Sequence, residues 1–272
     1  MRAASRGARY EGARLGFVPT MGALHEGHLS LVRAARDEND AVAASIFVNP
    51  TQFAPGEDFA KYPRSFERDC GMLEKEGVRL LFAPSAEEMY PGGAVTWVDV
   101  EGLSDRLCGR SRPGHFRGVS TVVAKLFHTV EPDVAFFGQK DAAQVAIIRR
   151  MVQDLRMAVK IVACPIVRER DGLAMSSRNA YLDASQRKQA LILYRSLCAV
   201  GDAFERGERR VEVLRGAGKR IFSEEPGVRL DYLEIVHPDT LTPVEVVTGA
   251  ALTAVAGFVG STRLIDNVLL DE

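Results

Sequence analysis

The sequence carries no large excess of charge of either sign. Its 272 residues include 35 Lys and Arg against 36 Asp and Glu, a formal net charge of −1. A general nucleic-acid binder concentrates basic residues, so this balance argues against a nucleic-acid partner. With 46% hydrophobic and 26% charged residues, the composition is typical of a globular protein and excludes a disordered tail, a collagen-like fibre and a coiled coil.

Cysteines and long apolar runs are also scarce. The four cysteines, Cys70, Cys108, Cys164 and Cys198, lie far apart and form no C-x-x-C pair, so we expect reduced thiols and no zinc site. No stretch approaches the roughly 18 apolar residues of a membrane span. The basic start of the chain is not followed by the apolar core of a signal peptide. These features predict a cytoplasmic protein without a membrane partner, whose first dozen residues are loosely ordered.

Short apolar runs and amphipathic segments alternate from residue 15 to residue 167. We expect strands at residues 15–18, 41–48, 79–83, 95–100, 134–137 and 159–167. We expect helices between them, at residues 29–39, 65–76, 119–130 and 141–156. Strands that alternate with helices of this length predict a parallel sheet with right-handed crossovers, in a Rossmann-like, doubly wound α/β domain.

The pattern changes after residue 168, where a charged turn occupies residues 168–172. The elements expected beyond it are one long helix at 184–206, a second helix at 211–224, and strands at 228–236 and within 251–268. This order is typical of a small α+β unit. We therefore predict two domains, a larger one at residues 1–168 and a smaller α+β C-terminal one at residues 169–272.

Two histidines follow the first predicted strand, in the segment from Pro19 to His28. His25 and His28 stand three residues apart at the expected first turn of a helix, so both imidazoles can face one side. The amides and dipole of a helix N-terminus favour an anion, and Gly22 and Gly27 let a base or phosphate approach the main chain. The segment predicts a nucleotide-phosphate site. Two surface histidines after a turn are the alternative, and a metal site lacks a third ligand nearby.

A second polar cluster follows the strand predicted at 134–137. Gly138, Lys140 and Asp141 come directly after it, and Gln144 lies on the same face of the next helix as Asp141. Lys140 offers a charge for a phosphate or a carboxylate, and Asp141 can accept hydrogen bonds from ribose hydroxyls. The alternative is that Asp141 only supplies a negative charge at a helix N-terminus.

Two further segments supply polar groups. Met175, Ser176, Ser177 and Arg178 form a polar loop just beyond the predicted domain boundary, where hydroxyls and a guanidinium group can wrap a triphosphate. An ordinary serine-rich loop is the alternative. Gln52 follows the second predicted strand and can donate to and accept from a small polar substrate.

Several common catalytic and nucleotide-binding motifs are missing. The sequence has no G-x-S-x-G elbow, no G-x-x-x-x-G-K-[ST] loop and no G-x-G-x-x-G fingerprint. Covalent catalysis by a serine is therefore not expected. Any nucleotide must be bound by a different arrangement of residues.

Six segments carry most of the polar residues described above, at residues 19–28, 46–53, 62–64, 112–116, 137–144 and 175–179. In this order they resemble the pantoate–β-alanine ligase family, within the nucleotidyltransferase superfamily that shares the H-x-G-H signature. H-x-G-H alone would fit many adenylyltransferases and some aminoacyl-tRNA synthetases, whereas all six together are specific to one family. The resemblance runs from about Gly16 to the C-terminus. Only Met1 to Arg14 precede the first strand, where the family usually has a longer segment.

The resemblance implies a ligase that joins pantoate to β-alanine in two steps. ATP and pantoate form an enzyme-bound pantoyl adenylate and pyrophosphate, and the amine of β-alanine then displaces AMP to give pantothenate. The family also implies Mg²⁺ as a cofactor and a homodimer. We expect the smaller domain to close as a lid, because the adenylate must be protected from water.

The resemblance also assigns residues to these roles. The expected ATP site comprises Met21, Gly22, His25, Gly27, His28, Gly138, Lys140, Asp141, Val167, Met175, Ser176, Ser177 and Arg178. The expected catalytic residues are His28, as the proton donor, His25 and Lys140. The expected substrate-binding residues are Gln52, Gln144 and Arg112, and Asp69 is expected to support Mg²⁺ from outside. Lys140, Arg112, Arg178 and the two histidines would concentrate positive potential on one crevice.

Other functions fit parts of the pattern. Another H-x-G-H nucleotidyltransferase, such as a cofactor adenylyltransferase, would leave AMP on its product. A nucleotide-binding regulatory protein would have a degenerate site, but the polar residues that the chemistry needs are present. An RNA-binding relative of the synthetases is disfavoured by the balanced charge.

Overall fold

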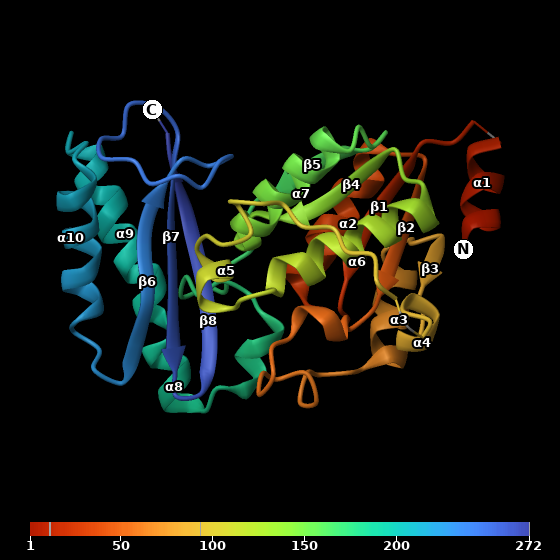
Figure 1. Ribbon diagram of the computed structural model, residues 1–272. Coiled ribbons are helices and arrows are strands. Elements are labelled where there is room, and N and C mark those ends of the chain that lie inside the picture. Colours follow the sequence, from red (N-terminus) through yellow and green to blue (C-terminus); the bar gives the residue numbers. More distant parts are fainter. Residues whose placement is uncertain (11, 93, 272) are drawn as a thin grey trace.

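Two β-sheets organise the molecule. The computed structural model describes residues 1–10, 12–92 and 94–271. The larger sheet has five parallel strands in the order β3-β2-β1-β4-β5, and the smaller one has three antiparallel strands in the order β6-β7-β8 (Figure 1). This architecture confirms the predicted doubly wound α/β fold with a smaller α+β part.

The elements have the following bounds. The larger sheet consists of β1 (Leu15–Thr20), β2 (Ala41–Ile46), β3 (Leu80–Phe82), β4 (Val134–Gly138) and β5 (Lys160–Cys164). The helices around it are α1 (Arg2–Tyr10), α2 (Glu26–Glu38), α3 (Phe66–Lys75), α4 (Ala86–Met89), α5 (Cys108–Ser111), α6 (His115–Val130) and α7 (Ala142–Asp154). The smaller part contains α8 (Ala184–Gln189), α9 (Leu191–Glu205), α10 (Val211–Phe222), β6 (Val228–Val236), β7 (Ala251–Val259) and β8 (Thr262–Leu270). Short 3-10 turns occur at η1 (Pro50–Gln52), η2 (Gln139–Asp141) and η3 (Ser177–Tyr181).

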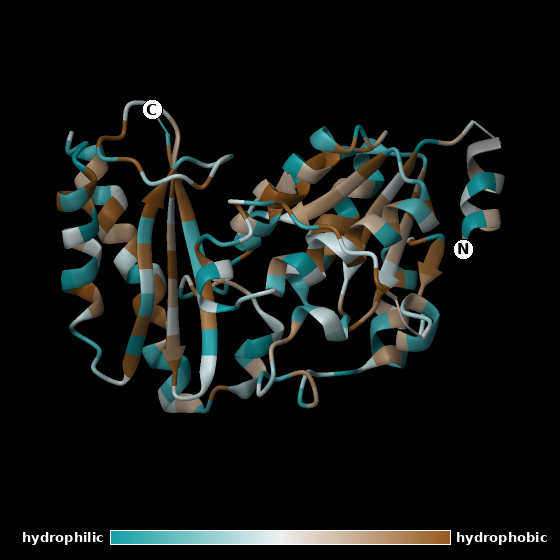
Figure 2. Ribbon diagram, in the orientation of Figure 1, coloured by the Kyte–Doolittle hydropathy of each residue, from teal (hydrophilic) through white to brown (hydrophobic). Residues whose placement is uncertain are grey.

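Both faces of the larger sheet are covered by helices, because successive side chains of a strand enter different cores. Phe17 of β1 packs with α6 and α7 on one face, while Val18 packs with α2 and α3 on the other. In β4, Phe137 packs in the same core as Phe17, and Phe136 packs in the same core as Val18. This double burial explains why the strands are continuous apolar runs in the sequence. Figure 2 shows hydrophobic residues along these strands and polar ones on the outer surfaces of the helices.

The order of strands reverses between β1 and β4. The chain proceeds from β1 to β2 and β3 on one side, and from β4 to β5 on the other. At such a switch point the connections leave the sheet in opposite directions and open a crevice at the carboxyl ends of the strands. The histidine segment follows β1 and the Lys140 segment follows β4, so the fold brings these two segments together.

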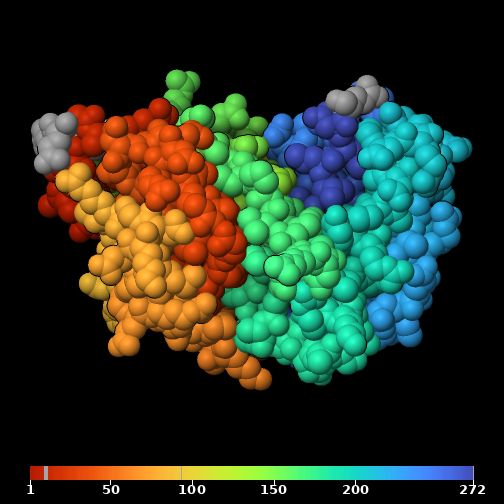
Figure 3. All heavy atoms as spheres, turned by 180° about the vertical axis from the view of Figure 1, so that it is seen from behind, coloured from red at the N-terminus to blue at the C-terminus, as the bar shows by residue number. Residues whose placement is uncertain are grey.

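The smaller sheet is also packed on both faces. One face lies against α9 and α10, and the other lies against the larger part of the molecule (Figure 1). Leu233 and Val255 belong to the first contact, whereas Tyr232 and Ala254 belong to the second. Seen from behind in Figure 3, the N-terminal and C-terminal parts form adjacent masses in broad contact.

Two sequence predictions for individual elements were wrong. Residues 95–100 are described throughout but form no strand, because Val98 donates its amide to the hydroxyl of Thr121 on α6 (2.9 Å) and pairs with no neighbouring strand. The helix expected at 184–206 is interrupted at Ala190, whose backbone angles (φ −58°, ψ −24°) make a tighter turn between α8 and α9.

The N-terminal segment is more ordered than its sequence suggested. Residues 2–10 form α1, and Arg6 forms an ion pair of 2.8 Å with Glu131 at the end of α6. Arg2 also donates to the carbonyl of His128 (2.9 Å), so the basic residues attach this helix to the larger part. In the described segments, no helix combines the length and apolar character that crossing a bilayer requires.

Candidate active site

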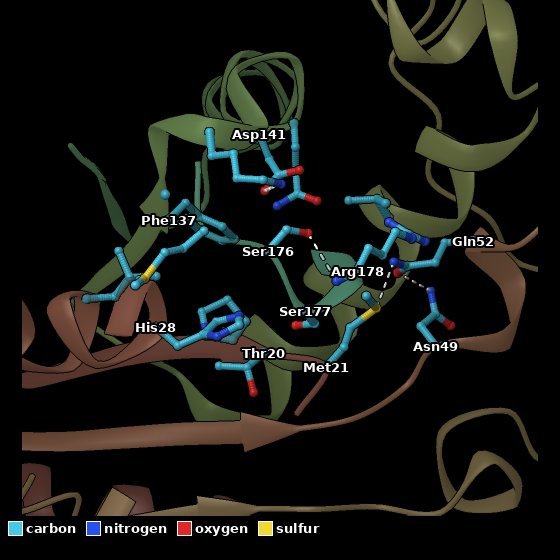
Figure 4. Close-up of a pocket in the computed structure, with 18 of the residues that line it drawn as sticks. Thr20, Met21, His28, Asn49, Gln52, Phe137, Asp141, Ser176, Ser177 and Arg178 are labelled. Atoms are coloured by element: carbon cyan, nitrogen blue, oxygen red, sulfur yellow. Dashed lines mark hydrogen bonds and ion pairs between the residues drawn. The ribbon is translucent and has the colours of Figure 1, made fainter. Parts of the chain in front are cut away.

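A cavity lies at the carboxyl edge of the larger sheet, where the loops after β1 and β4 meet the loop before α8. It measures about 230 Å³ and adjoins a cleft of about 670 Å³ beside β8. The two spaces share lining residues, including Arg112, His115, Lys140 and Arg178, so they form one continuous recess. Figure 4 shows side chains from these separate elements converging on the cavity. A recess of this size suits a nucleotide together with a small molecule.

The cavity brings together most of the site residues expected from the sequence. Those that line it are Met21, His25, Gly27, His28, Gln52, Arg112, Gly138, Lys140, Asp141, Gln144, Val167, Met175, Ser176, Ser177 and Arg178. Gly22 and Asp69 do not line it. These residues come from six separate segments of the chain, which the switch point and the smaller part of the molecule place around one space.

The two histidines of H-x-G-H cap the helix that they begin. His25 is the N-cap of α2, and its Nδ1 accepts a hydrogen bond from the amide of Gly27 (3.2 Å). Nδ1 of His28 accepts from the amide of His25 (3.3 Å), which completes a capping box. Since Nδ1 is an acceptor in both rings, each neutral imidazole carries its proton on Nε2. Both rings line the cavity and offer these N–H groups to a ligand.

Both imidazoles are neutral near pH 7. Burial, followed by the charge of Lys140, lowers the pKa of His25 from 6.5 to about 4. Burial, followed by the charges of His25 and Lys140, lowers the pKa of His28 from 6.5 to about 3. The ring centroids are only 4.1 Å apart, which disfavours a second positive charge. The geometry therefore favours hydrogen-bond donation from neutral rings over a charged imidazolium acid.

Asp69 lies beneath the loop that connects β1 to α2 and supports it. It is 1% exposed, and its carboxylate accepts hydrogen bonds from the amides of Ala23 (2.7 Å) and Leu24 (3.0 Å) and from the hydroxyl of Ser65 (3.1 Å). Ala23 has a φ of +49°, a conformation that costs energy for a residue with a Cβ. Asp69 thus holds a strained loop in place. Asp69 does not line the cavity, and its contacts are those of a residue that supports the loop.

Two glycines allow this loop to form. A Cβ on Gly27 would lie 2.9 Å from Cε1 of His25, so its absence leaves room for the capping ring. Gly22 has a φ of +79°, and a Cβ there would approach Oδ2 of Asp69 to 3.1 Å. Gly27 therefore contributes to the cavity directly, whereas Gly22 shapes the loop from below.

The side-chain amide of Gln52 is held at both ends. Its Oε1 accepts from Nδ2 of Asn49 (3.1 Å) and its Nε2 donates to the sulfur of Met21 (3.0 Å), as Figure 4 shows. Asn49 is 1% exposed and accepts a hydrogen bond from the hydroxyl of Tyr90 (2.8 Å). This network fixes the orientation of Gln52 and preorganises it for a polar ligand.

Arg112 is engaged by protein groups on one side and faces the cavity on the other. Its guanidinium group donates twice to Glu57 (2.6 and 2.7 Å) and once to the carbonyl of Gln52 (3.2 Å). His115 donates from Nδ1 to the same carbonyl (2.8 Å), and its Nε2 accepts from Arg112 (3.1 Å). Burial, followed by the charge of Arg112, lowers the pKa of His115 to about 4, so this ring is neutral. Together, Arg112 and His115 fix the main chain of Gln52.

The loop at 175–178 lines the cavity next to the segment that carries the histidines (Figure 4). The hydroxyl of Ser177 donates to the carbonyl of Ala23 (3.2 Å), which ties this loop to the one after β1. Arg178 donates twice to Asp58 (2.8 and 2.9 Å). Burial alone would raise the pKa of Asp58, but the hydrogen bonds and charge of Arg178 outweigh it and lower that pKa. The guanidinium group at the cavity is therefore already paired with a carboxylate.

One wall of the cavity is apolar and was not anticipated as part of the site. Its residues are Phe47, Val119, Val122, Val123, Leu126 and Phe137. The helical spacing of the four residues from α6 equally indicates an ordinary core, whereas Phe47 and Phe137 fall within segments that carry the family resemblance. Asn49, Tyr62 and His115 were also missed, although each falls within a segment that carries the family resemblance.

The donor set is poor for a metal held by protein alone. Within the described residues, no group of three or more His, Cys, Asp or Glu side chains could hold a metal ion. Asp141 is the acidic residue among those that line the inner cavity, and its side chain is 47% exposed. One carboxylate suits a Mg²⁺ ion that is held mainly by phosphate oxygens and water, which is common for this ion.

The whole chain is similar to proteins of one family. A family model described as pantoate-beta-alanine ligase matches residues 1–269. The pantothenate synthetase of Acidobacterium capsulatum is 63% identical over 283 aligned residues, which cover 100% of this chain and 95% of that protein. The crystal structure of the pantothenate synthetase from Thermus thermophilus matches with a TM-score of 0.94 at 51% identity, over 98% of this chain and 97% of that one.

A third relative has been solved with ligands. The pantoate-beta-alanine ligase from Francisella tularensis, complexed with beta-gamma ATP and beta-alanine, matches with a TM-score of 0.78 at 34% identity, over 98% of this chain and 95% of that one. These matches extend over both sheets and support the ligase over another H-x-G-H nucleotidyltransferase. The chain belongs to the pantoate–β-alanine ligase family, whose members are ligases that form a carbon–nitrogen bond.

Proposed function

We propose that the recess condenses pantoate with β-alanine, using ATP, through an enzyme-bound pantoyl adenylate. In the first step, a carboxylate oxygen of pantoate attacks the α-phosphorus of ATP, and pyrophosphate leaves with the electrons of the broken phosphorus–oxygen bond. In the second step, the amine of β-alanine attacks the acyl carbon, and AMP leaves. The observation that carries this proposal is a cavity in which neutral Nε2–H donors, cationic side chains and an apolar wall meet.

The first step needs donors directed at the phosphates and no nucleophile from the protein. His25 and His28 supply Nε2–H groups at the N-terminus of α2, where the helix dipole also favours negative charge. Lys140 enters the cavity from η2. Ser176, Ser177 and Arg178 enter it from the loop at 175–178. These donors would stabilise the charge that develops on the phosphate oxygens and on pyrophosphate.

The inner part of the cavity suits pantoate. Its apolar wall, with valines from α6, fits the two methyl groups of this acid. Gln52 and Gln144 line the same space and can bind its hydroxyl and carboxylate groups. Gln52 would also help to place β-alanine, and Arg112 would act mainly by fixing the main chain of Gln52. The Francisella relative, solved with beta-gamma ATP and beta-alanine, supports this choice of substrates.

The two parts of the chain would act as platform and cover. Residues 1–168 contain the larger sheet and the histidine and Lys140 segments, and residues 169–272 contain the smaller sheet. Ser177 reaches Ala23, and the hydroxyl of Tyr181 donates to the carbonyl of Lys61 (3.2 Å), so the second part contacts the first around the cavity. Such a cover would keep water from the adenylate between the two steps.

Mg²⁺ would accompany ATP. Bound to phosphate oxygens, the ion would neutralise part of their negative charge. Asp141 is the residue of the inner cavity with the right chemistry to contact it, directly or through water. The other polar side chains of the cavity include N–H groups and hydroxyls, which suit the phosphates themselves.

We also propose a homodimer and a cytoplasmic location. Residues 94–97 form an exposed segment without regular secondary structure, in which Val95 and Trp97 are 85% and 38% exposed. Exposed apolar side chains of this kind can pack against a second copy of the chain. The use of ATP as a substrate supports the cytoplasm.

The decisive experiment measures both products separately. With ATP, Mg²⁺ and pantoate, the protein should release pyrophosphate once per active site, and addition of β-alanine should restore turnover with release of AMP and pantothenate. Omission of pantoate is the control and should abolish pyrophosphate release. AMP that stays attached to the final product, or pyrophosphate release without pantoate, would contradict the proposal.

A further inference from the structure

Asn267, in the middle of β8, contacts the turn that carries Lys140. Its Nδ2 donates to the backbone carbonyls of Gln139 and of Lys140, each at 2.9 Å. The residue is 2% exposed, and its Oδ1 lies 3.5 Å from Nε2 of Gln139. A single buried amide thus uses its donors on two successive carbonyls of η2.

These two carbonyls belong to the peptide units on either side of Lys140. Each peptide unit is planar, so the orientations of the two units determine φ and ψ of the residue between them. Those angles set the direction in which the side chain of Lys140 leaves the main chain. The hydrogen bonds from Asn267 therefore restrict the starting point of a long and otherwise flexible side chain.

Asn267 is itself held by a neighbouring ion pair. Arg168 forms two hydrogen bonds with Asp266 (2.6 and 2.9 Å) and donates to the carbonyl of Asn267 (3.3 Å). Asp266 is 3% exposed, and breaking a buried pair of this kind is strongly destabilising. Two sets of contacts therefore hold β8 in place: the bonds from Asn267 to η2 and the ion pair between Asp266 and Arg168.

We propose that Asn267 is a positioning residue for Lys140, and that it makes the placement of this lysine depend on the smaller sheet. The inference rests on the proposed role of Lys140 at the ATP phosphates. Asn267 belongs to β8 and Lys140 follows β4, so separating the two sheets would break both hydrogen bonds. Because a displacement of about 1 Å in an active site can cost about 100-fold in rate, loss of this contact should slow adenylation although Asn267 does not bind the substrate.

Two variants test the contact directly. Asn267→Asp has the same shape but places carboxylate oxygens against two carbonyls, and Asn267→Ala removes the side chain. We expect both to lower kcat/KM for ATP in pyrophosphate release by about 10–100-fold, with Asn267→Asp the more impaired. Leu269→Ala, an exposed position (51%) on the same strand, is the control and should stay within about twofold of the original chain. If Asn267→Asp does not fold, Asn267→Ser takes its place.

A double variant distinguishes positioning from a general structural effect. If Asn267 acts through Lys140, then Asn267→Ala should have little further effect on pyrophosphate release in the Lys140→Ala background. An equal loss with and without Lys140, or normal kcat/KM in Asn267→Ala, would overturn the inference. Normal adenylation in the single variant Lys140→Ala would instead overturn the proposed role of Lys140, so the two failures are distinguishable.

Discussion

His25 both caps α2 and presents an N–H group to the cavity, and two substitutions separate these roles. His25→Ala removes the acceptor for the amide of Gly27 and the Nε2–H donor together. His25→Asn retains an acceptor, because Asn is among the most favourable N-cap residues, but it lacks a donor at the position of Nε2. The amide of His25 keeps its bond to His28 in both variants, since that bond uses the main chain.

The two roles predict different magnitudes. Loss of an N-cap side chain costs about 1 kcal/mol, which lowers the melting temperature of a chain of this size by about 2–4 °C. We expect this decrease in His25→Ala and a melting temperature within about 1 °C of the original chain in His25→Asn. Turnover should fall in both variants by about 100–1,000-fold, the usual effect of removing one donor from a site where negative charge develops.

Thermal unfolding and pyrophosphate release measured on the same preparations check both parts. His237→Ala is a matched control, because Nδ1 of His237 also accepts a backbone amide, that of Asp239 (3.2 Å), but His237 lies outside the cavity. This control should alter stability slightly and leave turnover unchanged. Normal turnover in His25→Asn would refute the donor role of His25. If His25→Asn melts at as low a temperature as His25→Ala, the capping role is refuted.

Three further predictions concern pH, the loop support and the Gln52 main chain. The folded-state pKa values of His25, His28 and His115, at about 4, 3 and 4, lie below the unfolded value of 6.5, so the unfolded chain binds more protons below about pH 6.5. Stability should therefore fall as the pH is lowered from about 6.5 toward 4, by about 2 kcal/mol at pH 5 for His115 alone. Urea unfolding at several pH values tests this, and a constant stability would contradict it. Asp69→Ala leaves the amides of Ala23 and Leu24 unpaired and should destabilise the fold by about 1–3 kcal/mol and raise the KM for ATP. An unchanged KM would show that the loop keeps its shape without Asp69. Glu57→Gln weakens the ion pair with Arg112, whose guanidinium group also bonds to the carbonyl of Gln52. This variant should raise the KM for pantoate more than the KM for ATP. Equal effects on both KM values would argue against a role through Gln52.

The sequence predicted the larger sheet well because each strand is buried on both faces. Residues such as Phe17 and Val18 enter different cores, and this produces the continuous apolar runs that identify strands. The candidate site was predictable for a related reason. Its polar segments directly follow strand runs, and the carboxyl ends of parallel strands share one edge.

Other features depend on contacts that a sequence does not display. Residues 95–100 alternate as a strand does, yet Val98 bonds to a helix hydroxyl. The basic residues of α1 suggested a loosely ordered terminus, but Arg6 forms an ion pair with Glu131 at the end of α6. Asn267 gave no signal either, because its partners are backbone carbonyls far away in the chain. In each case the deciding interaction joins segments whose proximity is a product of the fold.

The charge of the site also differs from the expectation drawn from its basic residues. Each arginine of the cavity has a carboxylate of its own, Glu57 for Arg112 and Asp58 for Arg178.

Lys140 lies 3.8 Å from Asp141, so a carboxylate stands beside this cationic side chain as well. Both capping histidines are neutral as well. We therefore expect phosphate recognition at the proposed site to depend on the direction of individual N–H and O–H donors as well as on charge. On this proposal, contacts that fix the direction of a donor, such as the capping box and the bond from Asn267 to η2, should affect the reaction although they add no charge.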